Sequence, residues 1–207
     1  LQWLHLDVLD KHRPDPERFP NINTDLRQAM QQETIHFLDH ILRRDLPVDE
    51  LINANYTFMN SALAEHYGFR SIPSVKYRRV RTPNESLGLL RHASILMATS
   101  NPTRTSPVKR GKWVLTSLLD APPPPAPPGV DGLTADGQVE GLSLREQMEM
   151  HRANPDCASC HIRMDALGFA LEGFDAVGRE KTGSDIDDLA KLPDGTEFRG
   201  ASGLRDV

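Results

Sequence analysis

Cysteine is scarce in this chain of 207 residues, which contains two cysteines separated by two residues near its C-terminal end. A zinc site of the usual kind would need a second Cys or His pair at similar spacing, and the sequence has none. Long apolar runs are also missing, since none approaches the ~18 residues of a membrane span. Positive charge is not in excess, because 24 Lys and Arg face 29 Asp and Glu, so neither a nucleic acid nor an anionic membrane is an expected partner.

The remaining composition is that of a protein with a core. The apolar content of 38% is sufficient for one, and a mean hydropathy of -0.47 indicates a soluble protein. A length of 207 residues suits one large domain or two small ones. The chain begins at Leu1 without a Met and stops at Val207 within what reads as continuing sequence. We therefore expect a mature fragment or a part of a larger protein.

The two cysteines lie in the stretch Cys157-Ala158-Ser159-Cys160-His161. This is a C-x-x-C-H motif, which is typical of the attachment site of a c-type haem. Two thiols three positions apart lie on one side of a helical turn, where each can add to a vinyl group of the haem. The adjacent His161 can then bind the iron from one face. The motif predicts one haem c, bound by Cys157 and Cys160, with His161 as an axial iron ligand.

Three other interpretations of this motif stay open. A zinc site would need ligands from elsewhere in the chain. A thioredoxin-like redox pair would need a βαβ setting, whereas the flanks of the motif read as helix and loop. The two cysteines could also be buried structural thiols beside a chance histidine.

The first half of the chain reads as mainly helical. An apolar stripe from Leu26 to Leu42 predicts a helix that begins with Thr24 as N-cap and continues through Arg44. Three shorter elements are expected after it: a helix opened by Pro47, a helix over residues 60–67 that Gly68 ends, and a strand over residues 75–80.

The second half contains a proline-rich stretch between helices. Pro107 starts a predicted helix over residues 108–119, and residues 121–129 must be polyproline II, a semi-rigid strap. Ser143 and Glu146 fit a capping box for a helix that ends near Arg152. The sequence from residue 182 onward reads as polar and turn-rich.

We therefore predict a mainly α protein with three parts. Residues 1–100 form a helical domain, and residues 101–130 form a helix and the proline-rich strap. Residues 131–207 form a cytochrome-c-like, haem-binding part with long loops.

Several stretches resemble one protein family. Residues 105–115, 151–161 and 165–175 are similar to the planctomycete-type, haem-bearing multidomain proteins, whose segments are catalogued mostly as domains of unknown function. The resemblance covers nearly the whole chain and implies two segments, of which the second carries the strap and the haem motif. It implies a c-type cytochrome without a settled activity. One departure is Ala166, where the family commonly has Pro.

The second axial position of the iron has several candidates. His151 precedes Cys157 by six residues, a span of up to about 20 Å, and is the first candidate for the sixth ligand. His92 and Met97 are alternatives, and an open position is another. Met164 follows His161 on the same helix and faces the same side of the haem, so it is expected to pack against the ring.

Other polar residues have weaker assignments. Arg110, in a basic cluster with Arg104 and Lys109, and the indole N–H of Trp113 are possible contacts of the haem propionates. The alternative is a solvated loop that leads into a helix. His36 and His40 lie four residues apart and are expected on a solvated face.

The expected function is electron transfer by a haem c protein in the periplasm or at the cell surface, because covalent haem attachment occurs outside the bacterial cytoplasm. Its partners would be other redox proteins or domains of a multi-haem assembly. A peroxidase- or oxidase-like haem enzyme with an open sixth position is one alternative. A structural subunit of an envelope or redox complex is another. We expect a carrier more than a catalyst.

Overall fold

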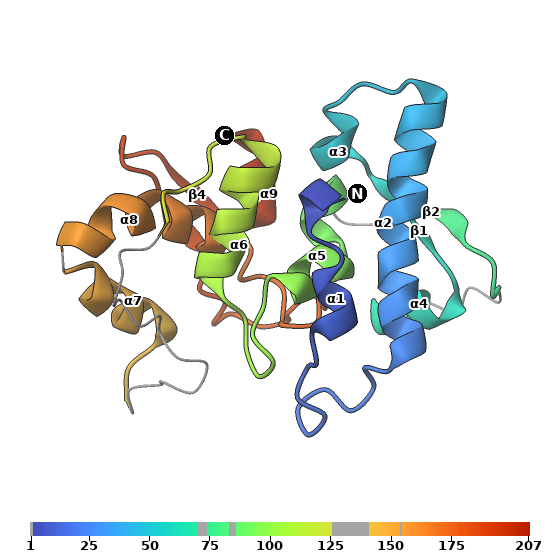
Figure 1. Ribbon diagram of the computed structural model, residues 1–207, viewed down its shortest axis with the longest axis horizontal. Helices are drawn as coiled ribbons and strands as arrows, with labels where there is room; N and C mark the ends of the chain where they lie inside the picture. Colours follow the sequence, from blue (N-terminus) through green and yellow to red (C-terminus); the bar gives the residue numbers. More distant parts are fainter. Residues whose placement is uncertain (1, 70–73, 83–85, 126–140, 154) are drawn as a thin grey trace.

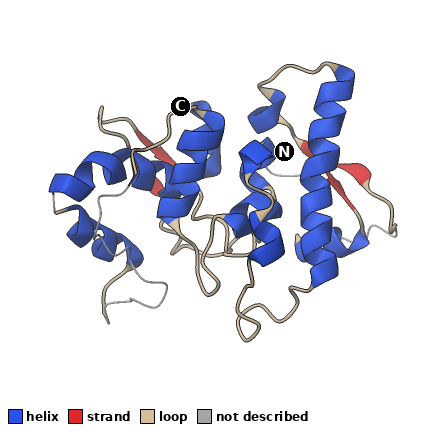
Figure 2. Ribbon diagram, viewed as in Figure 1, coloured by secondary structure: helices blue, strands red, loops and turns tan. Residues whose placement is uncertain are grey.

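Helices dominate the computed structural model, which describes residues 2–69, 74–82, 86–125, 141–153 and 155–207 (Figure 2). The predicted mainly α class is confirmed. In chain order the elements are η1 (Gln2–Leu4), α1 (Val8–Lys11), α2 (Thr24–Arg44), α3 (Glu50–Asn53), β1 (Tyr56–Met59), α4 (Ser61–His66), β2 (Arg78–Arg81), η2 (Gly88–Arg91), α5 (Ala93–Ala98), α6 (Pro107–Trp113), the π-helical turn η3 (Val114–Leu118), α7 (Leu144–Arg152), α8 (Pro155–Phe169), β3 (Leu189–Lys191), β4 (Glu197–Arg199) and α9 (Gly200–Asp206).

The long helix α2 forms where the apolar stripe predicts it. Its N-cap is Asn23, whose side chain accepts a hydrogen bond from the backbone N–H of Leu26 at 2.8 Å, so the prediction of Thr24 was wrong by one residue. Phe37 is fully buried on the inner face. Leu42 was also expected in the stripe, but 78% of its surface is exposed, although Leu38, one turn earlier, is buried; Leu42 lies in the last turn of the helix.

A short antiparallel hairpin covers one side of α2. β1 pairs with β2, and Tyr56 lies opposite Arg81. The predicted strand over residues 75–80 therefore begins later, at Arg78, and its partner β1 was not predicted. The helix expected over residues 60–67 is present as α4, and Asn60 caps it.

His36 and His40 project from α2 toward this hairpin. The His36 ring lies 4.8 Å from the Tyr77 ring, and the His40 ring lies 5.3 Å from the Phe58 ring, measured between centroids. Both histidines are half-buried. The expectation of a solvated face was therefore wrong, because aromatic side chains of the hairpin cover the histidines.

The predicted helix over residues 108–119 is present in two parts. α6 begins with Pro107, capped by Ser106, and the backbone widens into the π-helical turn η3. Leu119 was expected in the core but is 52% exposed, because it lies past the end of η3. Residues 121–125 have no regular secondary structure, and the rest of the predicted polyproline strap lies outside the described residues.

The helices α6 and α8 pack with their backbones in close contact. A Cβ atom built on Gly168 would lie 1.8 Å from the carbonyl oxygen of Pro107, and one on Gly111 would lie 1.7 Å from that of Met164. Both separations are far below any real Cβ contact, so only glycine fits at either position. These two glycines set the close approach that fixes α8 against α6.

The C-terminal region contains more regular structure than the sequence suggested. β3 pairs antiparallel with β4, with Ala190 opposite Phe198, and α9 follows directly. Ala190, Phe198 and Ala201 are buried and join the main hydrophobic core. The expectation of a polar, turn-rich end holds for residues 182–188, which have no helix or strand, and is wrong for residues 189–206, where widely spaced apolar residues meet on the inner face.

Along the longest axis of the molecule, α2 and the first hairpin lie at one end, and α7 and α8 lie at the other (Figure 1). α5 and α6 lie between them. One cluster of buried apolar residues extends from Leu4 to Ala201. The division into three parts stays a prediction. No helix among the described residues is long and apolar enough to cross a membrane.

Candidate haem-attachment site

The helix α7 leads into the C-x-x-C-H motif. Ser143 and Glu146 form the predicted capping box: the Ser143 hydroxyl accepts from the Glu146 N–H, and the Glu146 carboxylate accepts from the Ser143 N–H at 2.7 Å. This satisfies two backbone groups that a helix start otherwise leaves unpaired. The helix ends at Arg152, as expected, and carries His151 in its last turn.

The motif lies on α8, which continues well past it to Phe169. Cys157 and Cys160 are three residues apart and therefore lie on the same side of the helix. They are half-buried and are not joined in a disulfide. His161 follows on the same side, with 19% of its side chain exposed. Two accessible thiols and one imidazole are thus presented together.

Asp165 fixes the orientation of the His161 ring. Its carboxylate Oδ1 lies 3.0 Å from His161 Nδ1, one helical turn away, and its side chain is completely buried. The guanidinium of Arg152 lies 3.5 Å from the other oxygen, Oδ2. Oδ2 has no hydrogen-bond partner among the described residues, so the Arg152 contact is an ion pair without hydrogen-bond geometry.

His151 is the candidate sixth ligand that the structure brings beside the motif. Its ring centroid lies 4.9 Å from that of His161, with the planes at 78°, in an edge-to-face contact. The end of α7 and the motif helix therefore place two imidazoles side by side.

His92 lies in a different environment, against the long helix α2. Its Nδ1 is 2.9 Å from the Thr34 hydroxyl, its Nε2 is 3.4 Å from the Thr57 hydroxyl, and its ring packs edge-on against Phe37. Burial, with a smaller contribution from the charge of Arg91, lowers the pKa of His92 from 6.5 to about 3. Both ring nitrogens thus have partners at the α2 end of the molecule.

The remaining candidate, Met97, lies within the core, as do His66 and Met164. Met97 is fully buried in α5. His66 is buried, and its Nε2 lies 2.8 Å from the carbonyl oxygen of Val177. Met164 is buried where α8 meets α6. Whether Met97 or His92 binds iron stays a prediction, but their described contacts are those of core residues.

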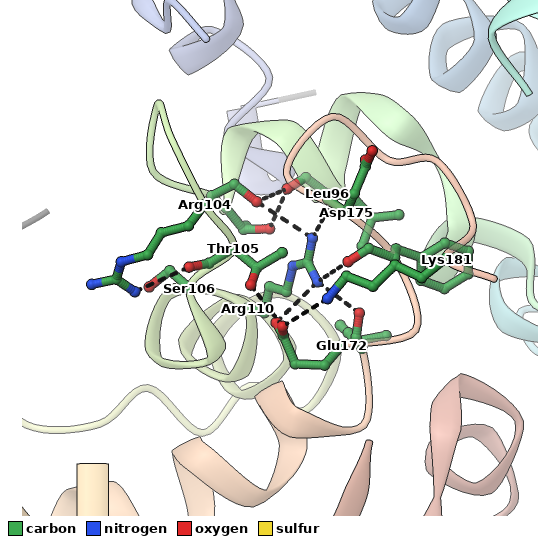
Figure 3. Close-up of polar contacts among 12 residues, drawn as sticks. Leu96, Arg104, Thr105, Ser106, Arg110, Glu172, Asp175 and Lys181 are labelled. Carbon is green, nitrogen blue, oxygen red and sulfur yellow. Dashed lines mark hydrogen bonds and ion pairs between the residues drawn. The ribbon is translucent and has the colours of Figure 1, made fainter. Parts of the chain in front are cut away.

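Arg110 is fully buried at the centre of a polar network (Figure 3). Its guanidinium donates to the carbonyl oxygens of Leu171, Phe174 and Asp175 at 2.6, 3.0 and 2.7 Å, and pairs with Glu172 at 3.2 Å. Burial lowers the pKa of Arg110, and the Glu172 and Asp175 charges oppose this shift. These contacts fasten the segment after α8 to α6.

Glu172 has two further partners. It accepts a hydrogen bond from the Thr105 hydroxyl at 2.6 Å and pairs with Lys181 at 3.3 Å (Figure 3). The propionate role of Arg110 stays a prediction, while its described contacts are structural. Lys109 likewise donates to the side chain of Asn101, at 2.6 Å.

Trp113 has an unpaired indole. The residue is 4% exposed, and its Nε1 has no hydrogen-bond partner among the described residues. A buried N–H is normally paired, so this donor is free for a group outside the described residues. Its proposed contact with a propionate stays a prediction.

A second buried polar cluster was missed by the sequence analysis. Glu33 is fully buried in α2 and accepts hydrogen bonds from the hydroxyls of Thr57 and Tyr67, each at 2.6 Å. Burial raises the pKa of Glu33 from 4.5 to about 7, although both hydrogen bonds oppose the shift. The position of Glu33 within the apolar stripe of α2 was the sequence signal that could have predicted its burial.

The contact of Asp165 with His161 was also missed by the sequence analysis. It follows His161 by four positions, which on a helix places the two side chains together. That spacing was readable from the sequence once the motif helix was assumed to continue.

The donor set at the motif fits a covalently attached haem. The Asp165 Oδ1 atom lies 3.0 Å from His161 Nδ1, and a carboxylate at this nitrogen favours the tautomer in which Nε2 is unprotonated and available to a metal. Thioethers bind the edge of the porphyrin, so the two thiols need not converge on the metal. No group of three or more His, Cys, Asp or Glu side chains able to hold an ion was found in the described parts of the chain.

A cavity of about 650 Å³ lies along another side of α8, where Arg163 and Leu167 form part of its lining. Its lining is mainly apolar and does not include the motif residues. We therefore do not assign this cavity to the haem.

Comparison with known families gives two matches. Residues 86–184 match the family described as "PSCyt3: Protein of unknown function (DUF1588)", and residues 1–69 match "PSD4: Protein of unknown function (DUF1592)". The two matches lie within the part of the chain where the sequence resembles the planctomycete-type proteins, and residues 157–161 lie within the first match. No curated protein and no solved structure matches the chain.

Proposed function

We propose that this chain is a c-type cytochrome that carries one haem, bound covalently through Cys157 and Cys160, with His161 as an axial iron ligand. The observation that carries the proposal is the arrangement on α8, where two free thiols and an imidazole share one side of the helix. The hydrogen bond from His161 Nδ1 to Asp165 supports it, because that bond leaves Nε2 for the metal.

Attachment requires little of the protein beyond reduced, accessible thiols. Each thiol adds its S–H across a vinyl C=C bond, with sulfur bonding one carbon and hydrogen the other, so no oxidant is consumed. Cys157 and Cys160 are free and half-buried, which suits this addition. When bound, the haem supplies a one-electron redox couple, and the function we propose is electron transfer.

The proposal includes a location and a class of partner. Covalent haem attachment implies maturation outside the bacterial cytoplasm, so we place the protein in the periplasm or at the cell surface. The partners would be other redox proteins, or haem domains of the same assembly.

We propose His151 as the sixth ligand, because it is the candidate that lies beside the motif. Its ring touches the His161 ring, so His151 would have to move away for an iron ion to lie between them. The Arg152–Asp165 ion pair, which lacks hydrogen-bond geometry, is one contact that joins the end of α7 to α8. An open sixth position is the alternative and would favour a haem enzyme.

The test is expression with export to a bacterial periplasm that attaches haem c. A denaturing gel stained for haem peroxidase activity, together with the intact mass, should show one haem on the wild-type chain. The variant Cys157→Ser/Cys160→Ser should run without haem at its sequence mass. If the wild-type chain also lacks haem, the cytochrome proposal fails and the motif must be reconsidered as a zinc or dithiol site.

The sixth position is tested on the haem-loaded protein with carbon monoxide. Wild-type protein with His151 as ligand should bind carbon monoxide weakly, and His151→Ala should bind it readily. Equal and strong binding by both proteins would indicate an open position, as in the enzyme alternative.

A further inference from the structure

A completely buried carboxylate contacts the proposed iron ligand from its own helix. Asp165 has an exposed side-chain fraction of 0%, compared with 19% for His161, and their Oδ1 and Nδ1 atoms are 3.0 Å apart. Exposed His–Asp pairs at this spacing are common on helices and contribute little. Here the carboxylate is removed from water, so its hydrogen bond to the imidazole is stronger and better defined.

The direction of this hydrogen bond follows from the groups involved. An ionised carboxylate only accepts, so Nδ1 of His161 carries the proton and Nε2 carries the lone pair. The bond also fixes the plane of the ring relative to α8. Asp165 thus selects both the tautomer and the orientation in which His161 meets a metal.

The positive charge of Arg152 offsets part of the free-energy cost of burying the Asp165 carboxylate. Its guanidinium lies 3.5 Å from Oδ2 of Asp165, and its Nη2 lies 3.8 Å from Glu149 on α7. Arg152 therefore faces two carboxylates, of which Asp165 alone touches His161 in the described structure. This arrangement supplies a matched pair of carboxylates for an experiment.

We propose that Asp165 is a positioning residue that makes His161 a stronger electron donor to iron and so lowers the reduction potential of the haem. A carboxylate that accepts the Nδ1 proton raises the basicity of the imidazole, and a more basic ligand favours the oxidised metal. This inference rests on the proposed function, because it requires the haem on Cys157 and Cys160.

The experiment compares Asp165→Asn with Glu149→Gln in the haem-loaded protein. Each variant replaces a carboxylate next to Arg152 by its amide, but Asp165→Asn alone weakens the bond to His161. Spectroelectrochemical titration should show that Asp165→Asn raises the ratio of reduced to oxidised haem about tenfold at a given potential, or 59 mV. Glu149→Gln should change this ratio less than about threefold, because Glu149 is largely exposed.

Electron paramagnetic resonance of the oxidised proteins gives a second readout. The g values report the donor strength of the axial imidazole, and they should change in Asp165→Asn and stay unchanged in Glu149→Gln. A role of Asp165 in stability alone would lower the unfolding midpoint without moving either the potential or the g values.

The possible failures are distinguishable. A wild-type chain without haem overturns the proposed function and this inference together. A loaded Asp165→Asn whose potential matches that of Glu149→Gln overturns the inference alone. If Asp165→Asn does not accumulate, the inference is tested by proton NMR of the reduced wild-type protein. A slowly exchanging, strongly downfield signal of the His161 Nδ1 proton supports the hydrogen bond to Asp165, and the absence of this signal refutes it.

Discussion

Replacement of Arg110 by Met should destabilise the fold severely. Met keeps much of the side-chain length and removes the charge and every donor. Three carbonyl oxygens, of Leu171, Phe174 and Asp175, then lose a partner, and Glu172 loses its closest buried cation. Arg110→Met therefore tests whether this network holds α6 and the segment after α8 together.

The magnitude can be worked from the contacts. Breaking a buried ion pair by removing one partner costs about 3–5 kcal/mol. Glu172 keeps Thr105 and Lys181, and the carbonyl oxygens of Leu171 and Asp175 keep backbone N–H donors, which offsets part of this cost, while the Phe174 carbonyl adds about 1 kcal/mol. We expect a loss of about 4 kcal/mol, which is a large share of a typical total of about 5–15 kcal/mol.

Urea unfolding followed by circular dichroism measures this loss. With a slope of about 2 kcal/mol per molar urea, the midpoint should fall by about 2 M. Arg43→Met is the matched control, because Arg43 pairs with Asp39 on an exposed turn of α2 and should cost under about 0.5 kcal/mol. Arg110→Lys keeps the charge with fewer donors and should lie between wild type and Arg110→Met.

The result that would refute this reasoning is a midpoint for Arg110→Met close to that of Arg43→Met. Arg110 would then contribute little to the stability of the fold, and that result would favour its predicted contact with a haem propionate. Under that alternative the variant should change the absorption spectrum or the retention of haem while leaving the unfolding midpoint in place.

Two further changes test other parts of the structure. Gly168→Ala should lower the free energy of unfolding by about 3 kcal/mol, measured with urea, because the added Cβ would overlap the Pro107 carbonyl. The control Gly173→Ala should be neutral, because no atom lies within 4 Å of its Cβ. Equal effects of the two variants would contradict the close contact of α6 and α8. Glu33→Gln should alter the pH dependence of stability. Folded Glu33 keeps its proton to about pH 7 and the unfolded chain releases it near 4.5, so its contribution is complete below pH 4.5 and is lost as the pH rises through 7. The free energy of unfolding of wild type relative to Glu33→Gln should therefore fall by about 3 kcal/mol over that range, and parallel pH profiles would exclude the burial effect.

Local patterns predicted the helices well because their signals lie within a few residues. The capping box of Ser143 and Glu146 and the stripe of α2 are read over spacings of three and four residues. The exceptions are also instructive. Leu42 and Leu119 are apolar residues at helix ends, where the sequence period no longer decides which side faces the core.

Contacts between distant residues could not be predicted in this way. Arg110 finds its acceptors 61 to 65 residues later in the chain, and no local pattern relates the two segments. The burial of Arg110 is a tertiary effect, and an exposed basic loop was the natural expectation. The small residues Gly111 and Gly168 gave no signal either, because the contact they permit appears only when α6 and α8 cross.

The motif was predictable, whereas its support was not. The C-terminal half of α8 is anchored by the glycine contact with α6 and, beyond the helix end, by Arg110. Residues Met164 to Leu171 are buried, while Cys157 and Cys160, one to two turns earlier, keep part of their surface exposed. A helix that is rigid at one end and accessible at the other can present two thiols to a large planar group without loosening the core. Under the proposed function, this division of α8 would leave Cys157 and Cys160 open to the haem, while the buried half of the helix makes the dense contacts with the core.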